Sequence, residues 1–197
     1  MARQGLISIL SLVICCYGLY QCFQHELPPH LIKGGHFQFL TNISLSLTIL
    51  YILQSILTPT SPYLRTQYNI VSNLEFTVTV CYWTLHFILP HFLNPKSQVH
   101  RDWSIDLAIH FWPYLYLLVF DSQDRIRAKK SWLLTAAVIV VYWCYIERIV
   151  SVNNDGITAF AYPFLNNKTL TERFVWMLLI WFISCLNYYI IGFRNML

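Results

Sequence analysis

Residues 103–122 read WSIDLAIHFWPYLYLLVFDS, an apolar run long enough to enter a membrane. Two ionisable residues, Asp106 and His110, lie near its start, and because they are four positions apart they share one face of a helix. Ionisable side chains at membrane depth are costly, which makes both residues candidates for a functional site. Pro113 has no N–H to offer the carbonyl of Ile109, so we expect a backbone defect beside His110.

The composition is typical of a chain surrounded by lipid. Of the 197 residues, 56% are hydrophobic and 11% are charged, against about 25% charged in a soluble domain. The net charge of +4 is spread along the chain without a basic tail, which gives no reason to propose a nucleic-acid partner. The six cysteines lie in apolar runs and form no CxxC pair, so we expect neither disulfides nor a zinc site.

Six apolar spans divide the chain, each near the roughly 20 residues that a helix needs to cross the hydrocarbon core. We place them at 5–23, 36–57, 71–92, 103–122, 131–152 and 173–193. The third is the weakest, because Glu75 lies near its start and His86 and His91 near its end. The sequence predicts an all-α fold, a single transmembrane domain over residues 1–197. It is a polytopic helical bundle of about six spans, one of them a candidate re-entrant segment.

Alternating spans predict which loops share a side of the membrane. One face should carry the loops 24–35, 94–102 and 153–172. On the other side, a tight cluster of basic residues between the fourth and fifth spans favours cytosolic termini. The cluster consists of Arg125, Arg127, Lys129 and Lys130.

The second and fourth spans start from the same face. Thr41 lies five residues past the start of one, and His110 lies seven past the start of the other. At 1.5 Å per residue, both should lie roughly 8 to 10 Å deep. A hydroxyl and an imidazole at matched depth could therefore face each other across the bundle, in an apolar cavity beneath one membrane surface.

Three motifs carry a resemblance to a known family. Residues 34–41, GGHFQFLT, resemble the Gly-Gly-x-aromatic-x-Phe-Leu-Thr opening of the second span in the androgen-induced and androgen-dependent TFPI-regulating membrane proteins, the FAR-17a/AIG-like family. The helix with His110 and Pro113 looks like the histidine helix of that family, and residues 162–165 look like its Tyr-Pro-Phe-Leu segment. Order and spacing agree over nearly the whole chain.

The resemblance implies a multi-spanning protein of the endoplasmic reticulum membrane. It also implies hydrolysis of fatty acid esters of hydroxy fatty acids by a threonine nucleophile and a histidine. Carried over to this sequence, those residues are Thr41 and His110.

The chemistry of these side chains is consistent with that activity. A threonine hydroxyl is a weak nucleophile until a base, held by a third group, takes its proton. We predict Thr41 as nucleophile, His110 as base and Asp106 as the orienting group, with no cofactor and no metal. The predicted partners are the lipid bilayer and a fatty-acyl ester that arrives from it, and no protein partner is indicated. Backbone N–H groups near Gly34-Gly35 are the candidate oxyanion hole.

Alternatives stay open for each residue and for the function. Thr41 could bond a backbone carbonyl or a neighbouring helix, His110 could fix helix packing, and Asp106 could cap its helix or pair with a histidine.

A metal-dependent lipid enzyme would draw its ligands from Asp106 and from His36, His86, His91 and His110, although no HxxxH or HxxHH spacing occurs. A transporter or scaffold is the third possibility, and no internal repeat indicates a transporter.

Overall fold

A computed structural model describes residues 2–92, 102–121, 128–153 and 155–194 of the chain. Within these residues the long elements are helices and no strand occurs. The α-helices are α1 (Ala2–Gln24), α2 (Leu40–Leu57), α3 (Leu64–Phe87), α4 (Trp103–His110), α5 (Trp112–Leu115), α6 (Ser131–Val152) and α7 (Leu170–Arg194). Short 3₁₀ turns are η1 (Pro29–Gly34), η2 (His36–Gln38), η3 (Pro90–Phe92) and η6 (Pro163–Leu165), and η5 (Tyr116–Phe120) is a π-helical turn.

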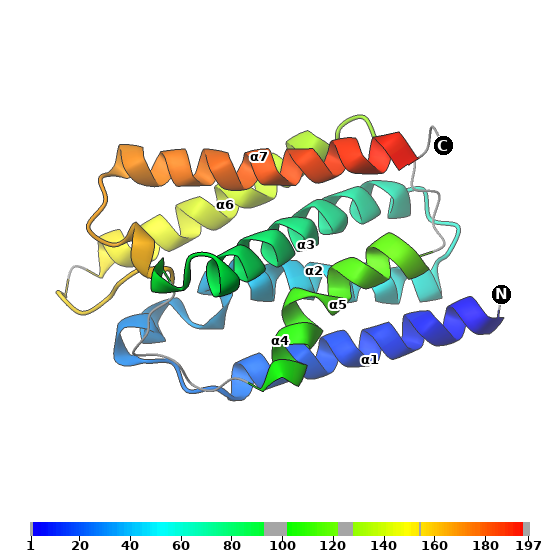
Figure 1. Ribbon diagram of the computed structural model, residues 1–197, viewed down its shortest axis with the longest axis horizontal. Coiled ribbons are helices and arrows are strands. Elements are labelled where there is room, and N and C mark those ends of the chain that lie inside the picture. The colour runs from blue at the N-terminus through cyan, green and yellow to red at the C-terminus, as the bar shows by residue number, and fades with distance from the viewer. Residues whose placement is uncertain (1, 93–101, 122–127, 154, 195–197) are drawn as a thin grey trace.

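The helices run back and forth along the long axis of the molecule (Figure 1). Four of them, α1, α2, α6 and α7, are long and apolar enough to cross a membrane. The helices α4 and α5–η5 pass the same test together and are bent by 44° against each other, which fits a broken span or a re-entrant loop; they are called the bent span below. The predicted helical membrane bundle is therefore confirmed, and the start of α1 and the end of α7 lie at the same end of it (Figure 1).

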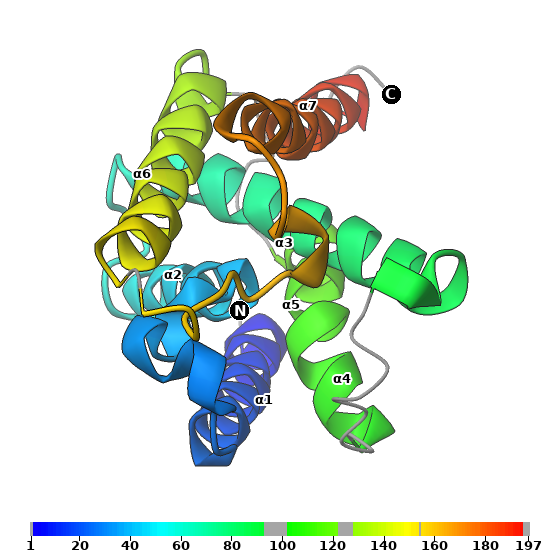
Figure 2. The ribbon, with the colours of Figure 1, turned by 90° about the vertical axis from the view of Figure 1, so that its left-hand side faces the viewer.

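The helix α3 differs from the predicted third span. It begins at Leu64 and ends at Phe87, whereas the prediction ran from residue 71 to 92. It is not among the helices apolar enough to span a membrane. Instead α3 lies at the centre of the bundle, in contact with α2, α4, α5, α6 and α7 (Figure 2).

Neighbouring helices supply hydrogen bonds to several polar side chains of α3. The Asn187 amide of α7 donates to the Ser72 hydroxyl and to Asn73 Oδ1, each at 3.0 Å. The Asn73 amide in turn donates to the Thr135 hydroxyl of α6 at 3.2 Å. A polar helix is stable inside a membrane bundle when its partners supply these hydrogen bonds, so α3 does not need an apolar surface.

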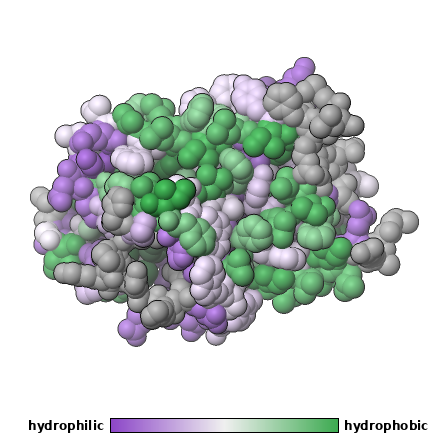
Figure 3. Space-filling view, in the orientation of Figure 1, coloured by the Kyte–Doolittle hydropathy of each residue, from purple (hydrophilic) through white to green (hydrophobic). Residues whose placement is uncertain are grey.

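The outward faces of the surrounding helices are apolar. Figure 3 shows apolar residues over the middle of one face and polar residues gathered toward its left end. Exposed examples are Leu10, Val13, Leu133, Val141 and Phe182. Contiguous exposed apolar surface of this kind suits a lipid environment.

Two of the three loops predicted to share a face do meet. The Ala159 N–H donates to the His30 carbonyl at 3.1 Å, and Lys33 pairs with Asp155 at 3.2 Å. The third loop, 94–102, lies outside the described residues except for Asp102. In the predicted basic cluster, Arg125 and Arg127 also lie outside them.

Candidate functional site

Helix α2 begins at Leu40, four residues later than the predicted span. One cause is local, because Gly35 has φ +59°, a left-handed conformation that favours glycine, and it separates the turns η1 and η2. The Gln38 amide holds both turns by donating to the Leu31 carbonyl at 2.7 Å and to the Gly35 carbonyl at 2.8 Å. Thr41 is therefore the second residue of α2.

The Thr41 hydroxyl makes no hydrogen bond with any residue that the structure describes, and neither does the Thr41 N–H. Three threonines in these helices behave differently, although the buried Thr79 hydroxyl of α3 also lacks a hydrogen-bond partner in the described chain. Thr48, Thr77 and Thr135 each donate their hydroxyl hydrogen to an acceptor at 2.8 Å. The structural role considered for Thr41, a hydrogen bond that ties a helix, is thus filled by the other threonines and not by Thr41.

The Tyr-Pro-Phe-Leu segment packs over the start of α2. The Tyr162 hydroxyl accepts a hydrogen bond from the Leu40 N–H at 3.2 Å, and its ring meets Phe39 edge-on. Phe164 packs on Trp176 of α7 at a centroid distance of 4.9 Å. Burial raises the pKa of Tyr162 to about 12, so this hydroxyl stays neutral at physiological pH. Two of the three motifs in the resemblance therefore meet beside Thr41.

These contacts correct the predicted oxyanion hole. The Gly35 N–H donates to the carbonyls of Leu31 and Ile32, each at 3.2 Å, so it is engaged in the turn. The Leu40 N–H is engaged by Tyr162. The N–H of Thr41, at the positive end of the helix dipole, is the better candidate donor.

His110 is the last residue of α4, and its side chain is only 4% exposed. The helix ends there because Phe111 leaves helical geometry, with φ −132° and ψ −51°. Pro113 then lies in the first turn of α5, where its missing N–H removes no helical hydrogen bond. The predicted defect thus takes the form of the 44° bend directly after His110.

The imidazole of His110 faces α3. It stacks on the Tyr82 ring with 3.5 Å between the centroids and 9° between the planes. Further along the same seam, Trp103 stacks on Trp83 at 6.0 Å, and Tyr114 meets Phe76 at 5.4 Å. The stripe of α4 and α5 that carries His110 therefore packs against α3.

Asp106 lies one turn before His110 on the same stripe and is 7% exposed. It does not cap the helix. The N-cap is Asp102, whose carboxylate accepts from the Ser104 N–H at 3.2 Å. The capping alternative for Asp106 is therefore wrong, whereas a role beside the His110 imidazole stays a prediction.

We infer from the helix register that Thr41 and Tyr82 lie at similar levels of the bundle. Helices α2 and α3 are antiparallel neighbours (Figure 1), and Thr48 of α2 donates to Glu75 of α3 at 2.8 Å. Seven residues are about two helical turns. Moving two turns toward the start of α2 and two turns toward the end of α3 leads from this pair to Thr41 and Tyr82, which therefore lie on the facing stripes.

The same stripe of α2 also faces α4. Leu45, one turn after Thr41, packs in one core cluster with Ala108 and Ile109 of α4. Ile109 itself faces Gly18 of α1, whereas His110 stacks on Tyr82 of α3, so a common seam for the Thr41 hydroxyl and the His110 imidazole is an inference from the helix register. Thr41, Tyr82, Asp106 and His110 are called the candidate site below.

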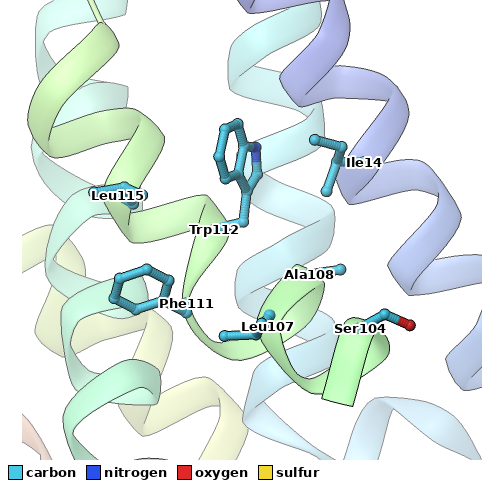
Figure 4. Close-up of a pocket in the computed structure, with 7 residues that line it drawn as sticks. All are labelled: Ile14, Ser104, Leu107, Ala108, Phe111, Trp112 and Leu115. Carbon is cyan, nitrogen blue, oxygen red and sulfur yellow. The ribbon is translucent and has the colours of Figure 1, made fainter. Parts of the chain in front are cut away.

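An open groove of about 330 Å³ lies on the other side of α4, away from α3 (Figure 4). Its walls are almost wholly apolar and come from α1 and from the bent span. They consist of Ile14, Ser104, Leu107, Ala108, Phe111, Trp112 and Leu115. The groove is thus not the cavity predicted between Thr41 and His110.

The histidines considered as metal ligands are dispersed. No three His, Cys, Asp or Glu side chains in the described part of the chain could hold a metal ion together. His36 meets Phe23 of α1 edge-on at 5.0 Å, and His86 lies among aromatic rings of α3 and α4. The side chain of His91 lies outside the described residues.

Sequence reasoning missed Tyr82. A tyrosine in an apolar run is usually assigned to the membrane interface, and nothing local distinguishes this one. Only the fold relates it to Thr41, because Tyr82 lies seven residues after Glu75 just as Thr41 lies seven residues before Thr48, and the contact between Thr48 and Glu75 is not visible in the sequence.

The apolar helices around a polar central helix, with an imidazole buried at a bent span, define a multi-spanning membrane protein. The chain belongs to the FAR-17a/AIG1-like protein family, whose model matches residues 4–195. This confirms the family resemblance in the sequence.

Two fungal relatives support the same assignment. The chain is 26% identical to the UPF0641 membrane protein YHR140W of Saccharomyces cerevisiae, over 81% of this chain and 77% of that protein. It is 27% identical to the UPF0641 membrane protein PJ4664.05 of Schizosaccharomyces pombe, over 67% of this chain and 62% of that protein. Both names state a membrane protein and no activity. No solved structure matches the chain.

Proposed function

We propose that this protein is a lipid ester hydrolase of the endoplasmic reticulum membrane, with Thr41 as nucleophile and His110 as general base. One observation carries the proposal. The Thr41 hydroxyl has no partner among the described residues, and counting two helical turns from the Thr48–Glu75 pair leads to Thr41 on α2 and to Tyr82, the ring that stacks on His110, on α3.

The first half-reaction would transfer an acyl group to the protein. Thr41 Oγ1 attacks the carbonyl carbon of a fatty-acyl ester while the His110 imidazole accepts the hydroxyl proton. The bond from the carbonyl carbon to the alcohol oxygen breaks, and the imidazole gives its proton to that oxygen. Asp106, one turn away, orients the imidazole and stabilises its charged form.

The second half-reaction would release the fatty acid. Water attacks the carbonyl carbon of acyl-Thr41 and gives a proton to His110. The bond to Thr41 Oγ1 then breaks, and the proton returns to that oxygen. In both halves the Thr41 N–H, at the start of α2, is placed to stabilise the developing oxyanion.

The surroundings suit a lipid substrate. The candidate site lies between helices whose outer faces are apolar, so an acyl ester can reach it from the bilayer without crossing water. The family resemblance favours fatty acid esters of hydroxy fatty acids within this class.

Hydrolysis of a fluorogenic acyl ester by the purified protein in lipid nanodiscs tests the proposal. Thr41→Ala and His110→Ala should each lower kcat/KM by about 100-fold or more. Thr41→Ala should also abolish labelling by a fluorophosphonate probe. Ser46→Ala is the matched control, because the Ser46 hydroxyl only donates to the Asn42 carbonyl of its own helix at 2.7 Å.

Two results would contradict the proposal. Full activity of a folded Thr41→Ala variant would exclude the threonine nucleophile. Loss of activity on chelation, with Thr41→Ala unaffected, would favour the metal-dependent alternative. Fractionation of cell membranes against an endoplasmic reticulum marker tests the proposed location.

A further inference from the structure

A carboxyl group is buried at the centre of the bundle. Glu75, in the middle of α3, is 0% exposed. Its Oε1 accepts from the Thr48 hydroxyl at 2.8 Å, while its Oε2 has no hydrogen-bond partner among the described residues. No Lys, Arg or His side chain that the structure describes forms an ion pair with it. The candidate site makes no use of this group.

Other buried polar atoms without a protein partner lie on α1 and α2. Ser44, one turn before Thr48 on α2, is fully buried and lies close to the same carboxyl. Its hydroxyl has no hydrogen-bond partner among the described residues. On α1, Cys15 is fully buried within electrostatic range of Glu75. Ser11, one turn before Cys15, is also fully buried, and its hydroxyl has no partner in the described chain.

These observations indicate the protonation state of the Glu75 carboxyl group and the hydrogen-bond partners that it needs. An ionised carboxylate at this depth without a cation is costly, so the neutral acid is the favoured form. A neutral acid carries an O–H donor, and each serine hydroxyl can both donate and accept. Buried polar groups in proteins that find no protein partner are commonly joined by an internal water, which makes about three hydrogen bonds.

We propose that Ser11, Ser44 and Glu75 bind internal water, and that this water site supplies the water that hydrolyses acyl-Thr41. The path is the stripe of α2 that faces α3, on which Ser44 lies one turn after Thr41 and one turn before Thr48. The supply of hydrolytic water rests on the proposed function. The water site itself does not.

The chemistry of the supply step is that of the second half-reaction. One water leaves the site, its oxygen bonds to the acyl carbon, and its proton passes through His110 to Thr41 Oγ1. Glu75 keeps its own proton throughout and acts only as a hydrogen-bond partner for the water. It is therefore a positioning residue.

X-ray hydroxyl-radical footprinting tests the water site without reference to catalysis, because radicals form at bound water and modify the side chains beside it. Cys15 is the reporter, and Met177 is the control, since it is a similarly buried sulfur side chain in an apolar cluster. In the full chain in nanodiscs, Cys15 should be modified about five-fold or more faster than Met177. Glu75→Met should abolish the excess, and Glu75→Gln should keep it. Equal slow modification of both sulfurs in the unaltered protein would overturn the water site.

Single-turnover kinetics test the supply of water. In Glu75→Met, deacylation should slow by about tenfold or more while acylation changes by less than about twofold, so that acyl-Thr41 accumulates and is seen by mass spectrometry. Equal slowing of both steps would show a structural role and overturn the supply. If Glu75→Met fails to fold, Ser44→Ala replaces it with the same expectation.

The same measurements separate the two proposals. Absence of any acyl group on Thr41, in the unaltered protein and in Glu75→Met alike, would remove the proposed hydrolase and the supply of water together. The footprint at Cys15 would still decide whether water binds beside Glu75.

Discussion

The Tyr82 ring lies flat against the His110 imidazole, with 3.5 Å between their centroids and 9° between their planes. Tyr82 also stacks on His86 at 5.7 Å and 23°, so the three rings form a row along the seam between α3 and α4. A stacked neighbour fixes the plane of an imidazole, whose nitrogens lie at the ring edge, where proton transfer takes place. The aromatic face of Tyr82 therefore positions His110.

Replacing Tyr82 tests whether its ring is the positioning feature. Tyr82→Phe keeps the stack, so kcat of ester hydrolysis should stay within about threefold. Tyr82→Leu removes the stack and should lower kcat about tenfold with little change in KM, and it should cost about 1 kcal/mol of unfolding free energy. Steady-state kinetics and unfolding in mixed micelles measure both effects. If Phe impairs catalysis as much as Leu does, the Tyr82 hydroxyl matters and the stack does not.

Thr41 and Thr48 should differ sharply in their contribution to stability. Thr48→Val leaves the buried Glu75 carboxyl without its donor, and the loss of such a buried hydrogen bond should cost about 1–3 kcal/mol of unfolding free energy. Thr41→Val removes a hydroxyl that has no partner in the described chain, so the cost should be below about 0.5 kcal/mol. Both variants have the same shape change, which makes each the control for the other. Equal destabilisation by Thr41→Val and Thr48→Val would show that the Thr41 hydroxyl has a structural role.

The hydropathy of the sequence predicts most of the bundle. The spans at 5–23 and 131–152 agree closely with α1 and α6, because helices that face lipid carry their signal in local composition. The fourth apolar run is also found, and its bend follows His110 directly, close to the defect that Pro113 predicts. These features depend on residues close in sequence.

Hydropathy does not predict features that depend on contacts between residues far apart in the sequence. Helix α3 is polar because α2, α6 and α7 supply its hydrogen bonds, and no sequence window contains those partners. The late start of α2 depends on turns that α6 holds, since Tyr142 and Tyr145 donate to the carbonyls of Gln38 and Gly34. Tyr82 belongs to the candidate site only through the register of α2 against α3. Motif resemblance finds Thr41 and His110, whereas the residues that support them appear only in the fold.

Gly18 should be required where α1 meets the bent span. A Cβ at this position would lie 2.5 Å from Ile109 Cγ2 and 3.5 Å from the Ala108 Cβ, so α1 would have to move away from α4. Gly18→Ala should therefore destabilise the protein by about 1–3 kcal/mol despite the better helix propensity of alanine. Gly5→Ala, in the same helix, is the control, because nothing lies within 4 Å of its Cβ position. Thermal unfolding in detergent should show the contrast, and a stabilising Gly18→Ala would disprove the close packing of α1 on α4.

The loop that follows α6 should resist acid because of Asp155. The backbone N–H groups of Thr158 and Ile157 donate to its carboxylate at 2.7 and 2.9 Å and, with a smaller contribution from Lys33, hold the pKa of Asp155 well below its usual range. A carboxyl with a lowered pKa stabilises the fold above its unfolded-state pKa, and this contribution is lost only as the pH falls through the lowered value.

Hydrogen exchange of the Ile157 and Thr158 amides measures that resistance. Their protection factors should stay constant from about pH 7 to about pH 3.5, although an ordinary aspartate is half protonated near pH 3.9. Asp155→Ala should remove the protection at every pH. Lys33→Met should lower it by less than about twofold, because the backbone donors dominate and the exposed ion pair contributes little. A fall in protection centred near pH 4 in the unaltered protein would show that the turn does not hold the carboxylate as described.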